Sequence, residues 1–139
     1  MIKATPGRRI FETGIVAIIR GIEAHVCNEV VTALAAGGVE TIEITANTPG
    51  AIEMIRQVSD EVDDIIIGAG TVLDSETARA VQLAGAEFVV TPAVNTDVIE
   101  TCNRYGTPIA TGVLTPTEAV KATEAGADFC KLFPASTVG

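Results

Sequence analysis

Lys131 is the first residue of chemical interest, because it lies in the apolar segment GADFCKLFPAS (126–136). Side chains at every second position of a strand share a face, so Phe129, Lys131 and Phe133 are predicted to point the same way. Burying an ammonium group is unfavourable unless the group is paired or gives up its proton. We therefore expect Lys131 either to reach solvent at the end of a strand or to take part in chemistry.

A carboxylate, Glu43, lies in a second apolar segment, VETIEIT (39–45). Alternation places it on one face with Thr41 and Thr45, while the isoleucines between them point the other way. The sequence leaves two interpretations of this charge open: an ion pair with Arg20 or Lys131, or a group that transfers protons.

A lysine and a carboxylate in one apolar site can perform Schiff-base chemistry. A poorly solvated amine gives up its proton more readily, and the free amine attacks a ketone to form an iminium, which is an electron sink. A carboxylate within reach, directly or through a water molecule, can carry the protons. Lys131 and Glu43 are our candidates for these roles. Glu40 is not, because it lies two residues past the Gly-Gly turn and is expected to begin a solvated strand.

The elements that must position these residues follow one repeated pattern, a β-branched apolar strand followed by an Ala/Glu-rich amphipathic helix. The predicted strands are 14–20, 39–45, 64–70, 87–92, 107–112 and 127–134, and the predicted helices are 23–36, 49–59, 74–84, 95–104 and 115–125. Six parallel strands with crossover helices fit either an open doubly wound sheet or part of a (β/α)8 barrel. In both folds, chemistry collects at the carboxyl ends of the strands.

Several element boundaries carry recognisable signals. Thr48 before Pro49, Asp74 or Ser75, and Thr115 with Glu118 three residues later are predicted to begin helices. The phrases AAGGVE, LAGAEF and EAGADF are typical of a glycine that ends a helix just before a strand.

Composition narrows the class of protein. With 139 residues, 47% of them hydrophobic, we expect residues 1–139 to form a single domain. A net charge of −9 argues against nucleic acid or anionic membranes as partners, and no apolar run approaches the roughly 20 residues that span a bilayer. One histidine and three scattered cysteines exclude a His-rich metal site, so we expect no metal site. We also expect a cytoplasmic location with free thiols.

The segment GAGTVLD (68–74) invites comparison with a dinucleotide-binding loop, but it lacks the third glycine of that motif. Its backbone N–H groups and the Thr71 hydroxyl could instead hold a small anion such as a carboxylate.

Five segments together resemble a known family: GIVAIIRG, GGVETIEIT, IGAGTVLD, FVVTPAVN and GADFCKLFPA. In this order they are similar to the strand-end motifs of the 2-keto-3-deoxy-6-phosphogluconate (KDPG) and 4-hydroxy-2-oxoglutarate (KHG) aldolases, which are class I aldolases on a (β/α)8 barrel and are often trimeric. The resemblance implies that Lys131 forms the Schiff base and that Glu43 is the acid/base. It further implies that Arg20, Thr71 and the Pro92 region hold the pyruvyl carboxylate, and that Phe133 packs on the substrate.

The chain departs from the family pattern in two places. Many members have an arginine where this chain has Asn47, so carboxylate binding is expected to depend on Arg20 and Thr71. The sequence also ends just past the sixth strand, so we expect a barrel of about six βα units, truncated at its C-terminal end.

These observations and the resemblance predict a class I aldolase that reversibly cleaves a 2-keto-4-hydroxy acid to pyruvate and an aldehyde. We expect this reaction to need no metal and no cofactor. As partners we expect the keto-acid substrate and further copies of the chain, in a trimer if the resemblance holds. The alternatives are a non-catalytic, aldolase-like binding or assembly protein with an incomplete barrel, and an open-sheet nucleotide-binding domain.

Overall fold

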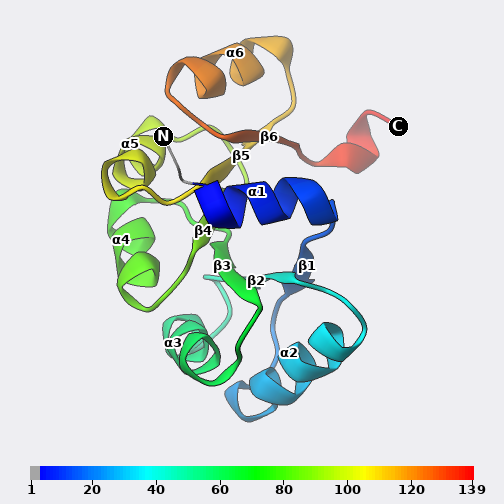
Figure 1. Ribbon diagram of the computed structural model, residues 1–139. Coiled ribbons are helices and arrows are strands. Elements are labelled where there is room, and N and C mark those ends of the chain that lie inside the picture. The colour runs from blue at the N-terminus through cyan, green and yellow to red at the C-terminus, as the bar shows by residue number, and fades with distance from the viewer. Residues whose placement is uncertain (1–3) are drawn as a thin grey trace.

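The computed structural model describes residues 4–139, with side chains from Pro6 onward. Helices and strands alternate along this part of the chain (Figure 1). The strands are β1 (Ala17–Ile19), β2 (Thr41–Thr45), β3 (Ile66–Gly70), β4 (Phe88–Thr91), β5 (Ile109–Val113) and β6 (Phe129–Leu132). The helices are α1 (Ala4–Thr13), α2 (Cys27–Ala36), α3 (Ala51–Glu61), α4 (Ser75–Leu83), α5 (Thr96–Tyr105) and α6 (Pro116–Glu124), with short 3-10 turns η1 (Ala24–Val26) and η2 (Ala135–Thr137).

The six strands form one parallel sheet in which spatial order follows chain order, β1-β2-β3-β4-β5-β6. A doubly wound sheet reverses direction at a switch point, and this sheet does not, so the open-sheet alternative is wrong. Helices α2 to α6 follow one another around one side of the curved sheet (Figure 1). The fold is thus a partial (β/α) barrel of six parallel strands, the first five each followed by a helix, which confirms the predicted fold class.

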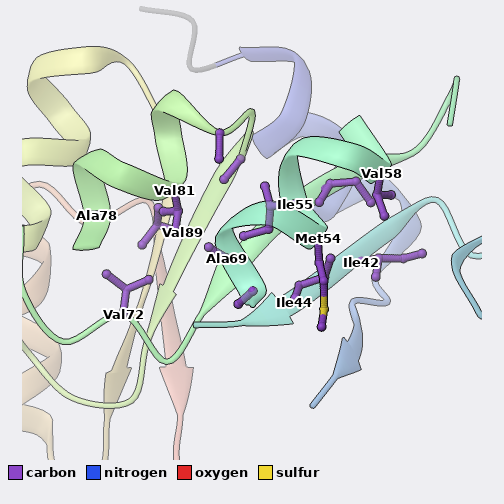
Figure 2. Packing of buried hydrophobic residues seen from close by; sticks show 14 of the residues in the cluster. Ile42, Ile44, Met54, Ile55, Val58, Ala69, Val72, Ala78, Val81 and Val89 are labelled. Carbon is purple, nitrogen blue, oxygen red and sulfur yellow. The ribbon is translucent and has the colours of Figure 1, made fainter. Parts of the chain in front are cut away.

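The outer face of the sheet packs against the surrounding helices. Ile42 and Ile44 of β2 are fully buried there, as alternation predicts, in one cluster with Met54 and Ile55 of α3. Figure 2 shows how this layer continues across β3 and β4 to α4. Its members there are Ala69, Val72, Ala78, Val81 and Val89. This apolar layer fixes the register that turns Glu43 to the other face.

The inner face has a smaller apolar cluster near the amino ends of the strands. Ile66, Phe88 and Val90 are buried there, and Ile10 of α1 packs against them. The sequence analysis did not predict α1, which crosses the sheet in Figure 1. Arg9 holds this helix against the sheet with two hydrogen bonds, donating to the Glu40 carboxylate at 3.1 Å and to the Asp64 carbonyl at 2.6 Å. Helix α1 therefore covers the amino end of the sheet. The carboxyl end is left open, and a functional site is expected there.

Most boundary signals are confirmed. Asp74 caps α4 by accepting from the Thr77 N–H, and Thr115 and Glu118 form a complete capping box on α6. Thr48 is wrong as a cap: α3 begins after Gly50, and the Thr48 hydroxyl bonds elsewhere. The glycines that precede β2, β4 and β6 all have positive φ, namely Gly38, Gly85 and Gly126.

Within residues 4–139 no helix is long and apolar enough to cross a membrane. The same residues contain no group of three or more His, Cys, Asp or Glu side chains that could hold a metal ion. Among the same residues the three cysteines form no disulfide bond.

Candidate active site

Glu43 is the buried charge of the inner face. It lies in the middle of β2 with only 2% of its surface exposed, between Thr41 and Thr45, which are fully buried. Burial raises the pKa of the Glu43 carboxyl above its ordinary value, while the charges of Lys131 and, less strongly, Arg20 oppose that rise. No basic side chain among the described residues lies within ion-pairing distance of Glu43, so the ion-pair interpretation is not supported. A carboxyl poised in this way can both release and take up a proton.

Gly70 makes room for this carboxylate. It ends β3, the strand beside β2, and a Cβ added there would lie 2.6 Å from Glu43 Cγ and closer still to the carboxylate oxygen. The Glu43 side chain therefore extends over Gly70 toward the carboxyl end of the sheet. The sequence analysis did not identify Gly70; the available signal was a glycine at an inward-facing strand position next to the candidate acid.

Lys131 lies on the inner face of β6, where its register partner on β5 is Gly112. The half-buried residues of β6 are Phe129 and Lys131, while Cys130 and Leu132 are exposed on the other face. The Lys131 ammonium lies 5.0 Å from the centroid of the Phe133 ring, a cation–π contact. The predicted shared face is thus confirmed for the lysine and its two phenylalanine neighbours.

Arg20 follows β1 and meets residues from the next two loops. One terminal nitrogen of its guanidinium donates to Asn47 Oδ1 at 3.1 Å, and the other donates to Thr71 Oγ1 at 3.1 Å. Thr71 has a φ of 55°, a left-handed conformation that is costly for a β-branched residue. Strain of this kind persists where the surrounding structure imposes it, often at functional sites.

Pro92 and Phe133 line a shallow hollow at the carboxyl ends of β4 and β5. The hollow has a volume of about 220 Å³ and is also lined by Ala93, Gly112, Val113, Leu114 and Glu118. A Cβ at Gly112 would lie 2.7 Å from Ala93 N and closer to the Pro92 carbonyl, so that carbonyl lies directly over the β5 backbone. Gly112, like Gly70, was missed from the sequence.

The structure thus brings all six predicted site residues to one side of the sheet. Glu43 and Lys131 lie on its inner face, Arg20 and Thr71 are joined at one end of the carboxyl edge, and Pro92 and Phe133 line the hollow at the other. These features define a parallel α/β protein of the (β/α)-barrel type, with an acid and a lysine facing the barrel interior.

The chain belongs to the KDPG and KHG aldolase family, whose model matches residues 8–139. It is 42% identical over 107 residues to the 2-dehydro-3-deoxy-phosphogluconate aldolase of Treponema pallidum, covering 77% of this chain and 51% of that relative. It is 37% identical over 126 residues to the 2-dehydro-3-deoxy-6-phosphogalactonate aldolase of Escherichia coli, covering 90% of this chain and 62% of that one.

Among solved structures, the KDPG aldolase of Legionella pneumophila, with pyruvate captured as a covalent carbinolamine intermediate, matches with a TM-score of 0.90. Identity there is 28%, and the match covers 99% of this chain and 66% of that one. A native KDPGal structure matches with a TM-score of 0.86 at 38% identity, covering 89% of this chain and 61% of that one. The chain therefore spans about half to two thirds of the length of these relatives.

Proposed function

We propose that this chain carries the Schiff-base site of a class I aldolase that reversibly cleaves a 2-keto-4-hydroxy acid to pyruvate and an aldehyde. The observation that carries the proposal is the placement of Glu43, buried on the inner face of the sheet, where the charge of Lys131 acts on it. The names of the relatives support KDPG, KHG or a phosphogalactonate analogue as substrate. The carbinolamine in the Legionella protein supports covalent chemistry in the family.

The reaction uses one lysine and one proton carrier. The free Lys131 amine attacks the C2 carbonyl of the substrate to give a carbinolamine, which loses water to form an iminium. Glu43 supplies the proton that the departing hydroxyl takes, and the resulting carboxylate accepts the proton of the C4 hydroxyl. The C3–C4 bond then breaks, its electron pair moves into the iminium to give an enamine, and the aldehyde leaves. Glu43 then gives the proton it holds to C3 of the enamine, and addition of water to the resulting iminium releases pyruvate and restores the lysine.

The remaining site residues would bind the substrate. Arg20 and Thr71 lie where a guanidinium and a hydroxyl can both bind the carboxylate of the keto acid. Pro92 and Phe133 line the neighbouring hollow, and Phe133 already contacts the Lys131 ammonium through its ring. In this arrangement the ketone carbon would lie between the lysine and the buried acid.

Borohydride trapping tests the proposal. The chain is incubated with pyruvate, reduced with sodium borohydride, digested and mapped by mass spectrometry. We expect a pyruvate-dependent adduct on Lys131, with Lys121, an exposed lysine on the outer helix α6, as the internal control. Adducts on Lys3 or Lys121 with Lys131 unmodified would show that the assignment is wrong.

We further propose that the chain assembles as a homo-oligomer, a trimer by family resemblance. A cube-shaped cage designed by fusing symmetric oligomeric domains matches this chain with a TM-score of 0.86 at 38% identity, covering 89% of this chain and 46% of that one. That match bears on assembly alone, and the second candidate function is an aldolase-like assembly protein without catalysis. Light scattering gives the oligomeric state, and an oligomer that pyruvate and borohydride fail to label would favour the second candidate.

A further inference from the structure

Arg20 differs from the other arginines in the kind of partner that holds it. The four that pair with carboxylates are Arg8, Arg9, Arg56 and Arg104. Arg79 stacks on the Tyr105 ring, 3.7 Å from its centroid. Arg20 is held instead by two neutral oxygens, those of Asn47 and Thr71. Neutral acceptors orient a guanidinium without neutralising it, so Arg20 keeps its full charge for an anion.

The Arg20 guanidinium also keeps donors to spare. It has five N–H groups, and the two hydrogen bonds use one on each terminal nitrogen. Its charge lowers the pKa of Glu43 against the effect of burial, so Arg20 acts on the same inner region as the candidate acid. A ligand carboxylate could therefore bind to Arg20 while its ketone approaches Glu43 and Lys131.

Asn47 is exposed, yet the loop that carries it is fixed on both sides. Before it, the Ala46 N–H donates to the Gly70 carbonyl at 2.7 Å. After it, the Thr48 hydroxyl bonds the Thr45 hydroxyl at 2.9 Å and accepts from the Gly21 N–H at 3.0 Å. The loop thus connects the ends of three strands, and the Asn47 amide is a fixed acceptor rather than a mobile surface group.

We propose that Asn47 is a positioning residue, which holds Arg20 so that its guanidinium receives the carboxylate of the 2-keto acid. The inference rests on the proposed function. It explains how a chain with a neutral amide at position 47 can still bind a carboxylate, because the amide fixes a cation that comes from the neighbouring strand. The amide acts through Arg20, so its loss should weaken binding and leave the covalent step intact.

Two measurements on the full chain test this inference. The first is the rate at which phenylglyoxal modifies Arg20, read by peptide mapping with Arg104 as reference. Asn47→Ala should speed the modification of Arg20 by about threefold or more, because the guanidinium loses a hydrogen bond, and should leave Arg104 unchanged. The exposed amide of Gln57 on α3 provides the matched control, and Gln57→Ala should change neither rate.

The second measurement is the pyruvate concentration that gives half-maximal borohydride trapping on Lys131. Asn47→Ala should raise it by about three- to tenfold with an unchanged plateau. Asn47→Asp keeps an oxygen acceptor, so Arg20 should stay slow toward phenylglyoxal, but the added charge neutralises the cation and should also raise the half-maximal concentration. A merely structural role for Asn47 would not separate the two readouts in this way.

The outcomes are distinct. Equal Arg20 rates in the unmodified chain and in Asn47→Ala overturn the proposal, as does a faster rate without any change in the pyruvate requirement. If the unmodified chain is not labelled by pyruvate at all, the proposed function falls and the carboxylate role falls with it. The phenylglyoxal rates would then still decide whether Asn47 holds Arg20.

Discussion

The Glu43 carboxylate occupies the space that a side chain at Gly70 would need. An added Cβ would lie 2.6 Å from Glu43 Cγ and overlap the carboxylate itself. Gly68, two residues earlier on β3, is blocked in the same way by a different neighbour, since a Cβ there would lie 2.5 Å from Phe88 Cδ1. The two glycines therefore serve as a test position and its control. Gly70 makes room for the candidate acid, and Gly68 makes room for Phe88 of the apolar cluster.

Gly70→Ala should abolish most of the proposed aldolase activity by displacing the Glu43 carboxylate. Overpacking costs about 1–3 kcal/mol of folding free energy, and Gly68→Ala should cost a similar amount. We expect Gly70→Ala to lower kcat at least about tenfold per folded molecule, because a 1 Å misplacement of a reacting group can cost far more. Gly68→Ala should retain kcat once the folded fraction is measured by urea titration. Equal losses of kcat in both variants would contradict the role of Gly70.

Glu43→Gln should lower kcat by roughly 10²-fold or more, the usual scale for a positioned acid or base. Glu40→Gln is the matched control, because Glu40 lies near the amino end of the same strand and pairs with Arg9. That partly exposed pair should contribute only about 0–1 kcal/mol to stability and nothing to the chemistry. Steady-state rates on KDPG and KHG provide the measurement. Similar losses in both variants would show that the wrong glutamate is assigned.

The same Glu43→Gln variant should be more stable than the unmodified chain at neutral pH. Burial raises the pKa of Glu43 in the folded chain above its unfolded value, so the folded state binds the proton more tightly. Below the unfolded pKa both states are protonated and no penalty exists. As the pH rises through the folded pKa, the ionised carboxylate destabilises the fold.

Urea titrations of both chains between pH 4 and pH 8 check this expectation. The difference in free energy of unfolding in favour of the glutamine variant should be near zero at pH 4 and reach about 1–2 kcal/mol at neutral pH. Gains of this size are common when a destabilising functional group is replaced. A constant difference across this range would indicate that Glu43 titrates alike in the folded and unfolded chains.

Thr111→Val should stabilise the chain. Thr111 is fully buried on β5, and its hydroxyl has no hydrogen-bond partner among the described residues. Removing a buried, unpaired hydroxyl should raise the free energy of unfolding by about 1 kcal/mol. Its register partner Thr91 is the control, because the Thr91 hydroxyl donates to the Ala93 carbonyl at 2.8 Å. Thr91→Val should therefore lower stability, and thermal melts of the two variants should shift in opposite directions.

Strand periodicity predicted the inner and outer faces of β2 correctly because its outer face is packed under helix α3. Glu43, Thr41 and Thr45 could be assigned to one face from alternation alone, and Lys131 with its phenylalanines likewise. The motif at Thr115 and Glu118 predicted a helix start because the capping interaction is entirely local.

What could not be predicted depends on contacts between distant segments. Helix α1 has a proline and a glycine, Pro6 and Gly7, in its first turns, and it is held by packing of Ile10 on a cluster formed much later in the chain. The fit of Glu43 over Gly70 and the bond from Arg20 to Asn47 likewise exist only once neighbouring strands are aligned. The spacing of residues along the sequence does not reveal contacts between side chains on different strands.

The sequential strand order has a consequence for synthesis on the ribosome. Each strand pairs only with the strands made just before and just after it, so the sheet can grow in the order in which the chain emerges. Helix α1 is the exception, because Gly7 lies against Pro108 and Phe129. We expect the first helix made to dock only after β4 has emerged, because Ile10 packs on Phe88 and Val90, and to complete its contacts once β6 is made. Proteolysis of stalled nascent chains should therefore find α1 protected only after β4 has emerged. Protection of α1 in chains stalled before β3 would contradict this order.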